Sequence, residues 1–174
     1  MASQLYSKIE FAVKQQRLTQ AQTYLQEMDT DFANTPYQDQ GHLFVAKLFM
    51  DSVDYENAIL QLEFLIDNST EESLKHIARI RIARIKLQQN LYDEALQTLE
   101  TESMGSFEAK YEEIKGDIFA KKGEYPEAQA AYLKALDLLL PGQFDYEYIQ
   151  MKFKDIQSDD LKDTKDSKDG NAWG

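Results

Sequence analysis

The two histidines of the chain, His42 and His76, could bind a metal ion or transfer a proton, because an imidazole does both near neutral pH. They stand 34 residues apart, which would place them on equivalent surfaces of neighbouring repeats and makes a shared metal ion conceivable. No histidine–carboxylate spacing of a known metal site accompanies them. We therefore expect two structural histidines and predict no metal site.

The other reactive side chains form no recognisable active site. The chain has no cysteine, which excludes disulfides, thiolate metal sites and cysteine nucleophiles. It has no glycine-rich phosphate loop and no nucleophile elbow. Adjacent carboxylates are common in so acidic a chain, and solvated faces or helix caps explain them: Glu71-Glu72, Glu112-Glu113 and Asp159-Asp160. The sequence thus predicts a protein that is not an enzyme and holds no cofactor.

The net charge of −12 narrows the class of partner. Nucleic acids and anionic lipid head groups both require a cationic surface, so we expect this protein to bind neither. The sequence has no run of about 20 apolar residues, the length needed to cross a bilayer. Other proteins remain as the expected partners.

The elements that would position a binding surface recur along the chain. A large side chain is followed three positions later by an alanine in four places, and these alanines are spaced by 37, 37 and 33 residues: Ala21, Ala58, Ala95 and Ala128. A period near 34 indicates helix-turn-helix repeats. In the last repeat Gly123 is expected to end one helix in the left-handed conformation, and Pro126 to lie in the first turn of the next.

The repeated unit resembles the tetratricopeptide repeat (TPR). That family combines small and bulky residues of a first helix with an aromatic, an alanine, a large residue and a closing proline, which the last copy has at Gly116, Phe119, Tyr125, Ala128, Tyr132 and Pro141. The small residues let two helices approach closely, and the large ones fill the gap beside them. The family's usual tryptophan is replaced by Arg79 and Glu112, so we expect an irregular array.

We therefore expect an all-α fold, a TPR-like right-handed α-solenoid, in residues 1–157. It would contain about four helix-turn-helix repeats and a C-terminal capping helix, at residues 3–32, 39–68, 73–102 and 107–140, with the cap at 143–157. Residues 158–174 are polar and charged without periodicity, which predicts a disordered tail. The only tryptophan, Trp173, lies in that tail.

Stacked helix pairs form a concave surface lined by their first helices, and this surface is the expected partner-binding site. Its candidate residues mix apolar and charged types: Tyr6, Leu43, Lys47, Met50, Ile80, Arg84, Leu87 and Asp117. The alternative is that many of them pack on the capping helix. Some TPR co-chaperones hold a peptide C-terminus with lysines, an arginine and asparagines at these positions. Because Glu113 and Asp117 stand there and the asparagines are absent, we expect an apolar or basic peptide instead.

Outside the tail, the chain also resembles YfgM-like proteins, the ancillary subunits of the bacterial Sec translocon. The resemblance lies in EESLKHIARIRIARIKLQQNLYDEALQTLE, FEAKYEEIKGDIFAKKGEYPEAQAAYLKAL and YIQMKFKDI. In that family a short cytosolic N-terminus and one transmembrane helix precede periplasmic repeats. The resemblance therefore implies that this chain begins just after a membrane anchor, on the periplasmic side of the bacterial inner membrane.

The resemblance implies partners as well. Family members associate with SecYEG and with the periplasmic chaperone PpiD, and are thought to pass newly translocated proteins to chaperones. SecYEG, a PpiD-like chaperone and unfolded secreted chains are then the expected partners. The alternative is a TPR adaptor that assembles another envelope or cytosolic complex. An apolar helix upstream of Met1 would favour the translocon, and a genuine start at Met1 would favour the adaptor.

Overall fold

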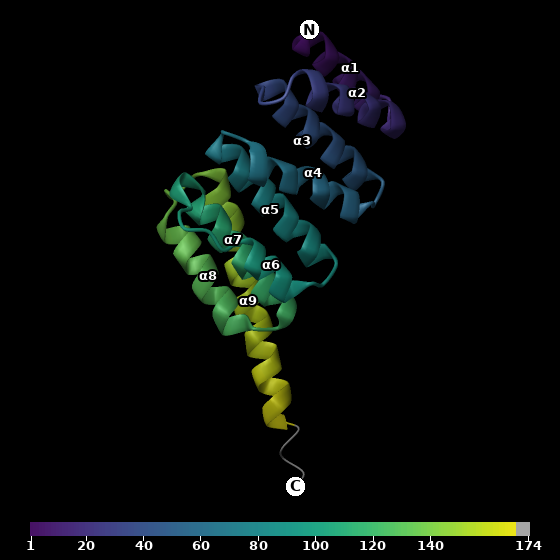
Figure 1. Ribbon diagram of the computed structural model, residues 1–174. Helices are drawn as coiled ribbons and strands as arrows, with labels where there is room; N and C mark the ends of the chain where they lie inside the picture. The colour runs from purple at the N-terminus through teal and green to yellow at the C-terminus, as the bar shows by residue number, and fades with distance from the viewer. Residues whose placement is uncertain (170–174) are drawn as a thin grey trace. The chain divides into compact units, whose positions relative to one another are not determined.

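Residues 1–169 are described by the computed structural model, with side chains described through residue 158, and every regular element in that range is helical. Four helix pairs precede one long helix (Figure 1). The pairs are α1 (Ala2–Lys14) with α2 (Leu18–Asp31), α3 (Pro36–Asp51) with α4 (Tyr55–Asn68), α5 (Glu72–Gln88) with α6 (Tyr92–Thr98), and α7 (Glu108–Lys122) with α8 (Tyr125–Asp137). The last helix is α9 (Phe144–Asp169), and a short 3-10 helix, η1 (Gly105–Phe107), precedes α7. The predicted all-α repeat fold is confirmed.

The turn inside each pair repeats one backbone motif. One residue adopts a positive φ two positions before the second helix begins, at Gln16, Val53, Asn90 and Gly123. The next residue donates its N–H to the carbonyl five positions earlier, at 2.9 Å in all four turns. This hydrogen bond satisfies a carbonyl at the helix end. Gly123 and Pro126 take the predicted places, whereas a β-branched Val53 at φ 59° is unexpected.

The chain divides into two compact units, unit 1 at residues 1–85 and unit 2 from residue 86 onward, with the boundary inside α5. The sequence predicted one continuous repeat domain over residues 1–157. Repeat proteins divide readily because each repeat packs only on its neighbours, so no single core holds the whole chain.

The core of unit 1 combines residues of α1 to α4 with one face of α5. Its fully buried members include Ile9, Met28, Phe49, Leu62 and Leu65, and Ala78, Ile82 and Ile85 of α5 join the same cluster. The repeated alanines Ala21 and Ala58 have no exposed surface. Removing such small residues from water stabilises little by itself, and their main effect is to let neighbouring helices approach.

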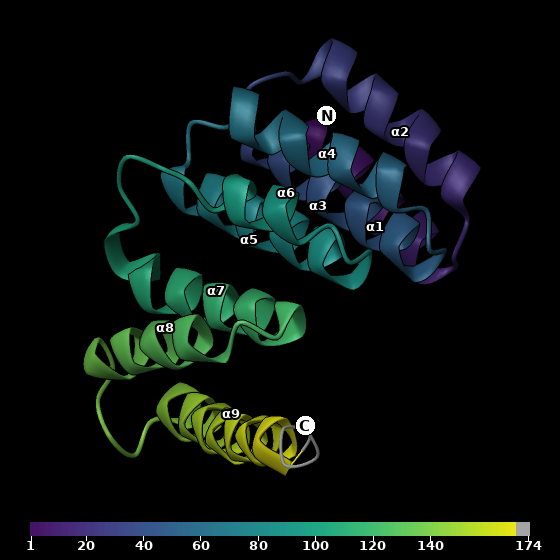
Figure 2. The ribbon, with the colours of Figure 1, turned by 90° about the horizontal axis from the view of Figure 1, so that it is seen from below.

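Unit 2 is built on α7, α8 and α9, with α8 packed between the other two (Figure 2). A close approach of α7 to α8 explains the predicted motif residues. A Cβ on Gly116 would lie 2.5 Å from the ring of Tyr132, which is itself 2% exposed. Only glycine fits below this ring, and Ala128 on the same helix is fully buried.

The capping helix is longer than the sequence indicated. α9 continues to Asp169, although a disordered tail was expected from residue 158. Between Gly142 and Gly170 the chain has neither glycine nor proline, so no residue type that stops a helix interrupts it. The rest of the predicted tail, residues 170–174 with Trp173, lies outside the described residues.

Candidate functional site

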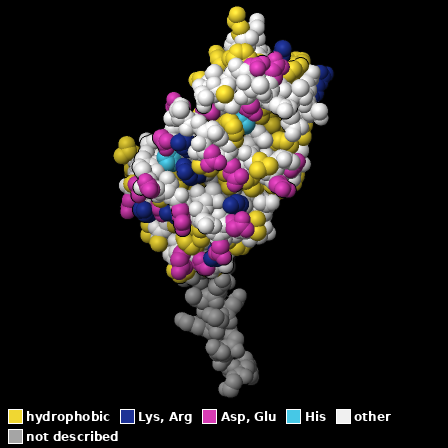
Figure 3. Space-filling view, viewed as in Figure 1, with side chains coloured by type: hydrophobic (Ala, Val, Ile, Leu, Met, Phe, Trp, Pro, Cys, Tyr) yellow, Lys and Arg dark blue, Asp and Glu magenta, His cyan; other side chains and the backbone are white. Residues whose placement is uncertain are grey.

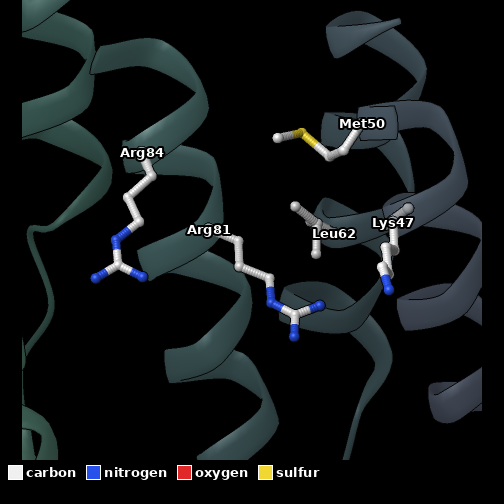
Figure 4. Close-up of a pocket in the computed structure, with 6 residues that line it drawn as sticks. Lys47, Met50, Leu62, Arg81 and Arg84 are labelled. Atoms are coloured by element: carbon white, nitrogen blue, oxygen red, sulfur yellow. The ribbon is translucent and has the colours of Figure 1, made fainter. Parts of the chain in front are cut away.

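A cavity of about 260 Å³ lies in unit 1 between α3 and α5, with α4 beneath it (Figure 4). We call it the α3–α5 cavity, and it is lined by Ala46, Lys47, Met50, Leu62, Arg81 and Arg84. Its floor is apolar, because Ala46 and Leu62 belong to the core and Met50 is half-buried beside them. Figure 4 shows the Met50 and Leu62 side chains projecting into the space between the two helices.

The rim of the cavity is cationic in a chain that is strongly acidic overall. Lys47, Arg81 and Arg84 are all exposed, and the space-filling view shows such dark blue groups among more numerous magenta acidic ones (Figure 3). Neither Lys47 nor Arg81 forms an ion pair with any carboxylate whose side chain the structure describes. The rim therefore presents positive charge that the described protein does not neutralise.

Arg81 lies in an unfavourable electrostatic environment. Partial burial, followed by the nearby charge of Arg84, lowers the pKa of the Arg81 guanidinium from its usual value. The side chain as a whole is exposed, so its desolvation is only partial, and arginine stays charged at physiological pH. A bound anion would offset both the desolvation and the like-charge repulsion.

A cluster of three aromatic side chains lies on α1 and α3, the first helices of the first two pairs. The ring of Tyr6 is 5.5 Å from that of Tyr37 and 5.7 Å from that of Phe44, measured between centroids. Phe44 and Lys47 line a second, smaller depression that also includes Glu10 and Asp51. Lys47 thus connects the α3–α5 cavity to a surface of mixed charge.

Three of the predicted concave-face residues come together at the cavity, namely Lys47, Met50 and Arg84. Tyr6 joins the aromatic cluster, Leu43 packs against the core of unit 1, and Leu87 is half-buried. Ile80 is only 7% exposed and so is unsuited to contact a partner. Arg81 was not among the predicted residues, although its spacing of three from Arg84 predicts that both share one helix face.

Asp117, the remaining predicted residue, belongs to an internal ion network of unit 2. Lys152 of α9 donates hydrogen bonds to Glu113 and Asp117 of α7, each at 2.8 Å. Lys110 also pairs with Glu113, and the Tyr132 hydroxyl donates to Asp117 at 2.7 Å. We call these five residues the Glu113 network. Asp117 is therefore engaged by internal partners in unit 2.

The Glu113 network is mostly buried, which makes its pairing essential. The Glu113 side chain is 1% exposed and that of Lys152 is 17% exposed. Burial alone would raise the pKa of Glu113, but hydrogen bonds from Lys110 and Lys152 outweigh it and hold the pKa below the usual value. Burial would likewise lower the pKa of Lys152, but its bonds to Asp117 and Glu113 raise it. Both groups are thus stabilised in their charged forms.

Glu112 and Glu113 were expected on a solvated face, and that expectation is wrong. Glu112 is 5% exposed and accepts hydrogen bonds from Lys115 at 2.9 Å and Lys134 at 3.1 Å. Adjacent residues of a helix point about 100° apart, so two neighbouring buried carboxylates need separate cationic partners. The chain supplies them from three different helices, which composition alone does not reveal.

The histidines occupy enclosed positions. His42 is 4% exposed, stacks on Phe64 at 3.7 Å, and lies within hydrogen-bond distance of Gln61 and Asp29 at 2.9 and 3.0 Å. His76 is 9% exposed, and burial followed by the charge of Arg79 lowers its pKa. Among the described residues, no group of three or more histidine or acidic side chains could hold a metal ion.

Comparisons with known proteins agree with this fold. A family model described as a tetratricopeptide repeat-like domain matches residues 1–158. Solved structures of MamA are also similar: MamA from Desulfovibrio magneticus RS-1 has a TM-score of 0.62 at 16% identity and covers 98% of this chain and 97% of its own. A MamA double mutant gives 0.63 at 15% identity, with the same coverage. At such low identity the likeness shows the fold alone.

Several relatives are named ancillary SecYEG translocon subunit, which confirms the resemblance to YfgM-like proteins. The relative from Buchnera aphidicola (Schizaphis graminum strain) is 36% identical over 115 residues, covering 66% of this chain and 59% of its own. Those from Neisseria gonorrhoeae and Escherichia coli K12 are 29% and 30% identical, over 68% and 52% of this chain.

The chain spans 59% or less of the length of these relatives, with 56% for the Neisseria protein and 44% for the Escherichia protein. Within the described residues, no helix has the length and apolar character required to cross a membrane. The family model, in contrast, covers nearly all of the described side chains. The chain therefore belongs to the tetratricopeptide repeat-like domain family.

Proposed function

We propose that this chain is the protein-binding domain of an ancillary SecYEG translocon subunit and catalyses no reaction. In the full-length protein a transmembrane anchor would hold it at the periplasmic side of the bacterial inner membrane. There it would contact SecYEG and help pass newly secreted chains to a PpiD-like chaperone. The names of the relatives support the assignment to the translocon, and the repeat fold supports protein binding.

One structural observation carries the binding role: the α3–α5 cavity exposes an apolar floor beside Lys47 and Arg81, two cations without described carboxylate partners. A protein that used these helices only for its own stability would gain by neutralising such charges, as unit 2 does around Glu113. Lys47, Met50 and Arg84, together with Arg81, are therefore the residues we propose for partner contact. The aromatic cluster around Tyr6 would extend this surface along α1 and α3.

The test is co-purification from membranes. The full-length protein with its native anchor would be expressed in its host, cross-linked in intact cells and recovered in detergent. We expect SecYEG subunits and a periplasmic foldase in the wild-type sample at levels well above an unrelated anchored TPR protein. Recovery of neither would contradict the proposal and favour an adaptor for another complex.

A further inference from the structure

We infer that the α3–α5 cavity binds a protein segment that presents one large apolar side chain flanked by side-chain carboxylates. The inference deepens the proposed function and rests on it for the existence of a protein partner, but not for the identity of that partner. It follows from the size of the cavity, its floor and the charges on its rim.

The floor and the volume indicate an anchor for a single side chain. Small-molecule pockets usually enclose about 300–1,000 Å³, and this cavity, at about 260 Å³, is smaller. Its floor is formed by Ala46, Leu62 and the half-buried Met50, and methionine adapts to apolar groups of different shape. Burying one leucine- or phenylalanine-sized side chain there would remove its apolar surface from water and so favour binding.

The rim selects the charge of the segment. Lys47 of α3 and Arg81 of α5 have no ion-pair partner among the described carboxylates, and Arg84 lies one turn from Arg81. In Figure 4 the charged ends of Arg81 and Lys47 lie below Leu62, whereas Arg84 extends away from Met50 and Leu62. Carboxylates form short, often bidentate hydrogen bonds with guanidinium groups, so an acidic segment would neutralise the rim and relieve the repulsion that Arg84 exerts on Arg81.

The same charges reverse the expectation of an apolar or basic peptide. That expectation came from Glu113 and Asp117, which the structure assigns to the internal network of unit 2. A basic segment at the cavity would face Lys47 and Arg81, which have no described carboxylate partner. A long polyanion is also unfavourable, because the net charge of −12 would repel the parts that extend beyond the rim. A short segment with a few carboxylates satisfies both conditions, since the interaction between exposed charges is screened beyond about 8 Å at physiological salt.

The inference can be tested on the purified chain with four fluorescent peptides, measured by anisotropy. The first is a seven-residue peptide blocked at both ends, with a central phenylalanine and two acidic residues on each side. The second replaces the acids by lysines, the third replaces phenylalanine by alanine, and the fourth has serines in place of the acids and a free C-terminal carboxylate. We expect the first to bind at least about tenfold more tightly than each of the others, and more weakly as salt is raised.

Charge-reversal variants locate the binding. Arg81→Glu combined with Arg84→Glu should weaken the acidic peptide about tenfold or more, while the lysine peptide gains affinity. Arg79→Glu is the matched control for Arg81→Glu alone, because it makes the same single change on α5 at a residue that does not line the cavity. All three variants should retain the circular dichroism and melting temperature of the wild type.

Four results would overturn the inference: equal binding of the lysine peptide, equal binding of the alanine peptide, preference for the free C-terminus, or competition by vesicles of anionic phospholipid. Failure of all four peptides to bind would overturn it too. These outcomes are separate from those of co-purification. SecYEG recovery without peptide binding would leave the proposed function standing, and peptide binding without SecYEG recovery would contradict only the assignment to the translocon.

Discussion

In unit 2 the ammonium of Lys152 is bound by Glu113 and Asp117, whereas in unit 1 Lys47 and Arg81 have no described carboxylate partner. Both units are built from the same helix pairs, with the same turn hydrogen bond. Unit 2 uses its cation to join α9 to α7, and unit 1 presents its cations at the edge of an apolar cavity. The difference shows that one repeat scaffold can either pair a cation internally or leave it without a described carboxylate partner.

Breaking the Glu113 network should have the largest effect. Lys152→Met leaves two carboxylates without their shared cation. We expect the free energy of unfolding of unit 2 to fall by about 2–3 kcal/mol, because removing one partner of a buried ion pair leaves the other as an uncompensated buried charge. Lys110 remains near Glu113, which keeps the loss below the usual maximum. Hydrogen exchange of the backbone amides of α7 and α9 measures this change in the stability of unit 2.

Two controls sharpen this comparison. Lys154→Met changes an exposed lysine on the same helix that donates a side-chain hydrogen bond to Gln150. This variant should change the free energy of unfolding of unit 2 by less than about 0.5 kcal/mol. Arg81→Met should change the free energy of unfolding of unit 1 by an equally small amount. A large loss at Arg81 would show that its charge serves the fold.

The close approach of helices should also differ between the units. Gly116→Ala places a methyl group against the Tyr132 ring, and we expect a net loss of about 1–2 kcal/mol after the gain in helix propensity. Gly41→Ala in unit 1 meets the terminal methyl groups of Leu25 at 2.9 Å and Ile9 at 3.4 Å, which are the far ends of flexible side chains, so its effect should be near zero. Urea unfolding followed by circular dichroism compares them, and equal losses would contradict the packing account.

Acid should weaken unit 2 through Glu113. Its folded pKa lies below the usual value of 4.5, so the unfolded chain binds more protons once the pH falls below about 4.5. The stabilisation from Glu113 is therefore complete above that pH and is lost as the pH falls through the folded pKa, with a slope of at most about 1.4 kcal/mol per pH unit. Glu113→Gln should reduce the slope of stability against pH between 4.5 and 3, and an unchanged slope would assign it to other carboxylates.

The turns give the smallest effect. Val53 in unit 1 adopts φ 59° and is 66% exposed, so little burial of its side chain offsets the conformational strain. Val53→Asn should raise the free energy of unfolding by about 1 kcal/mol, because asparagine tolerates the left-handed conformation. Gly123 occupies the equivalent turn of unit 2, where a Cβ would meet no atom within 4 Å. Gly123→Val should lower the free energy of unfolding by about 1 kcal/mol. A neutral result at both turns would show that the strain is small.

The repeat fold could be predicted from sequence because its signals are local. The alanine spacing and the turn residue Gly123 each depend on one helix pair, and the structure places Ala21, Ala58, Ala95 and Ala128 at zero exposure. The site was predicted in part, since Lys47, Met50 and Arg84 line the cavity. Which of the repeat's first-helix residues reach a partner stays a prediction.

The features that sequence reasoning missed depend on contacts between distant residues. Glu113 is buried because Lys152, 39 positions away, reaches it, and an acidic pair carries no local sign of such a partner. Arg81 was overlooked because it alternates with core isoleucines in α5, where Ile80 and Ile82 are buried on either side of it. The boundary between the two units inside α5 could not be recognised from the sequence, because no glycine or proline occurs in that helix.

The central claim, that unit 1 presents its cations while unit 2 uses its own for stability, is tested most directly by an NMR titration of the labelled chain with the acidic phenylalanine peptide. We predict chemical-shift changes at Lys47, Met50, Arg81 and Arg84, with α7 and α9 unaffected. Changes centred on Glu113, Asp117 and Lys152, or no changes at the α3–α5 cavity, would contradict the account.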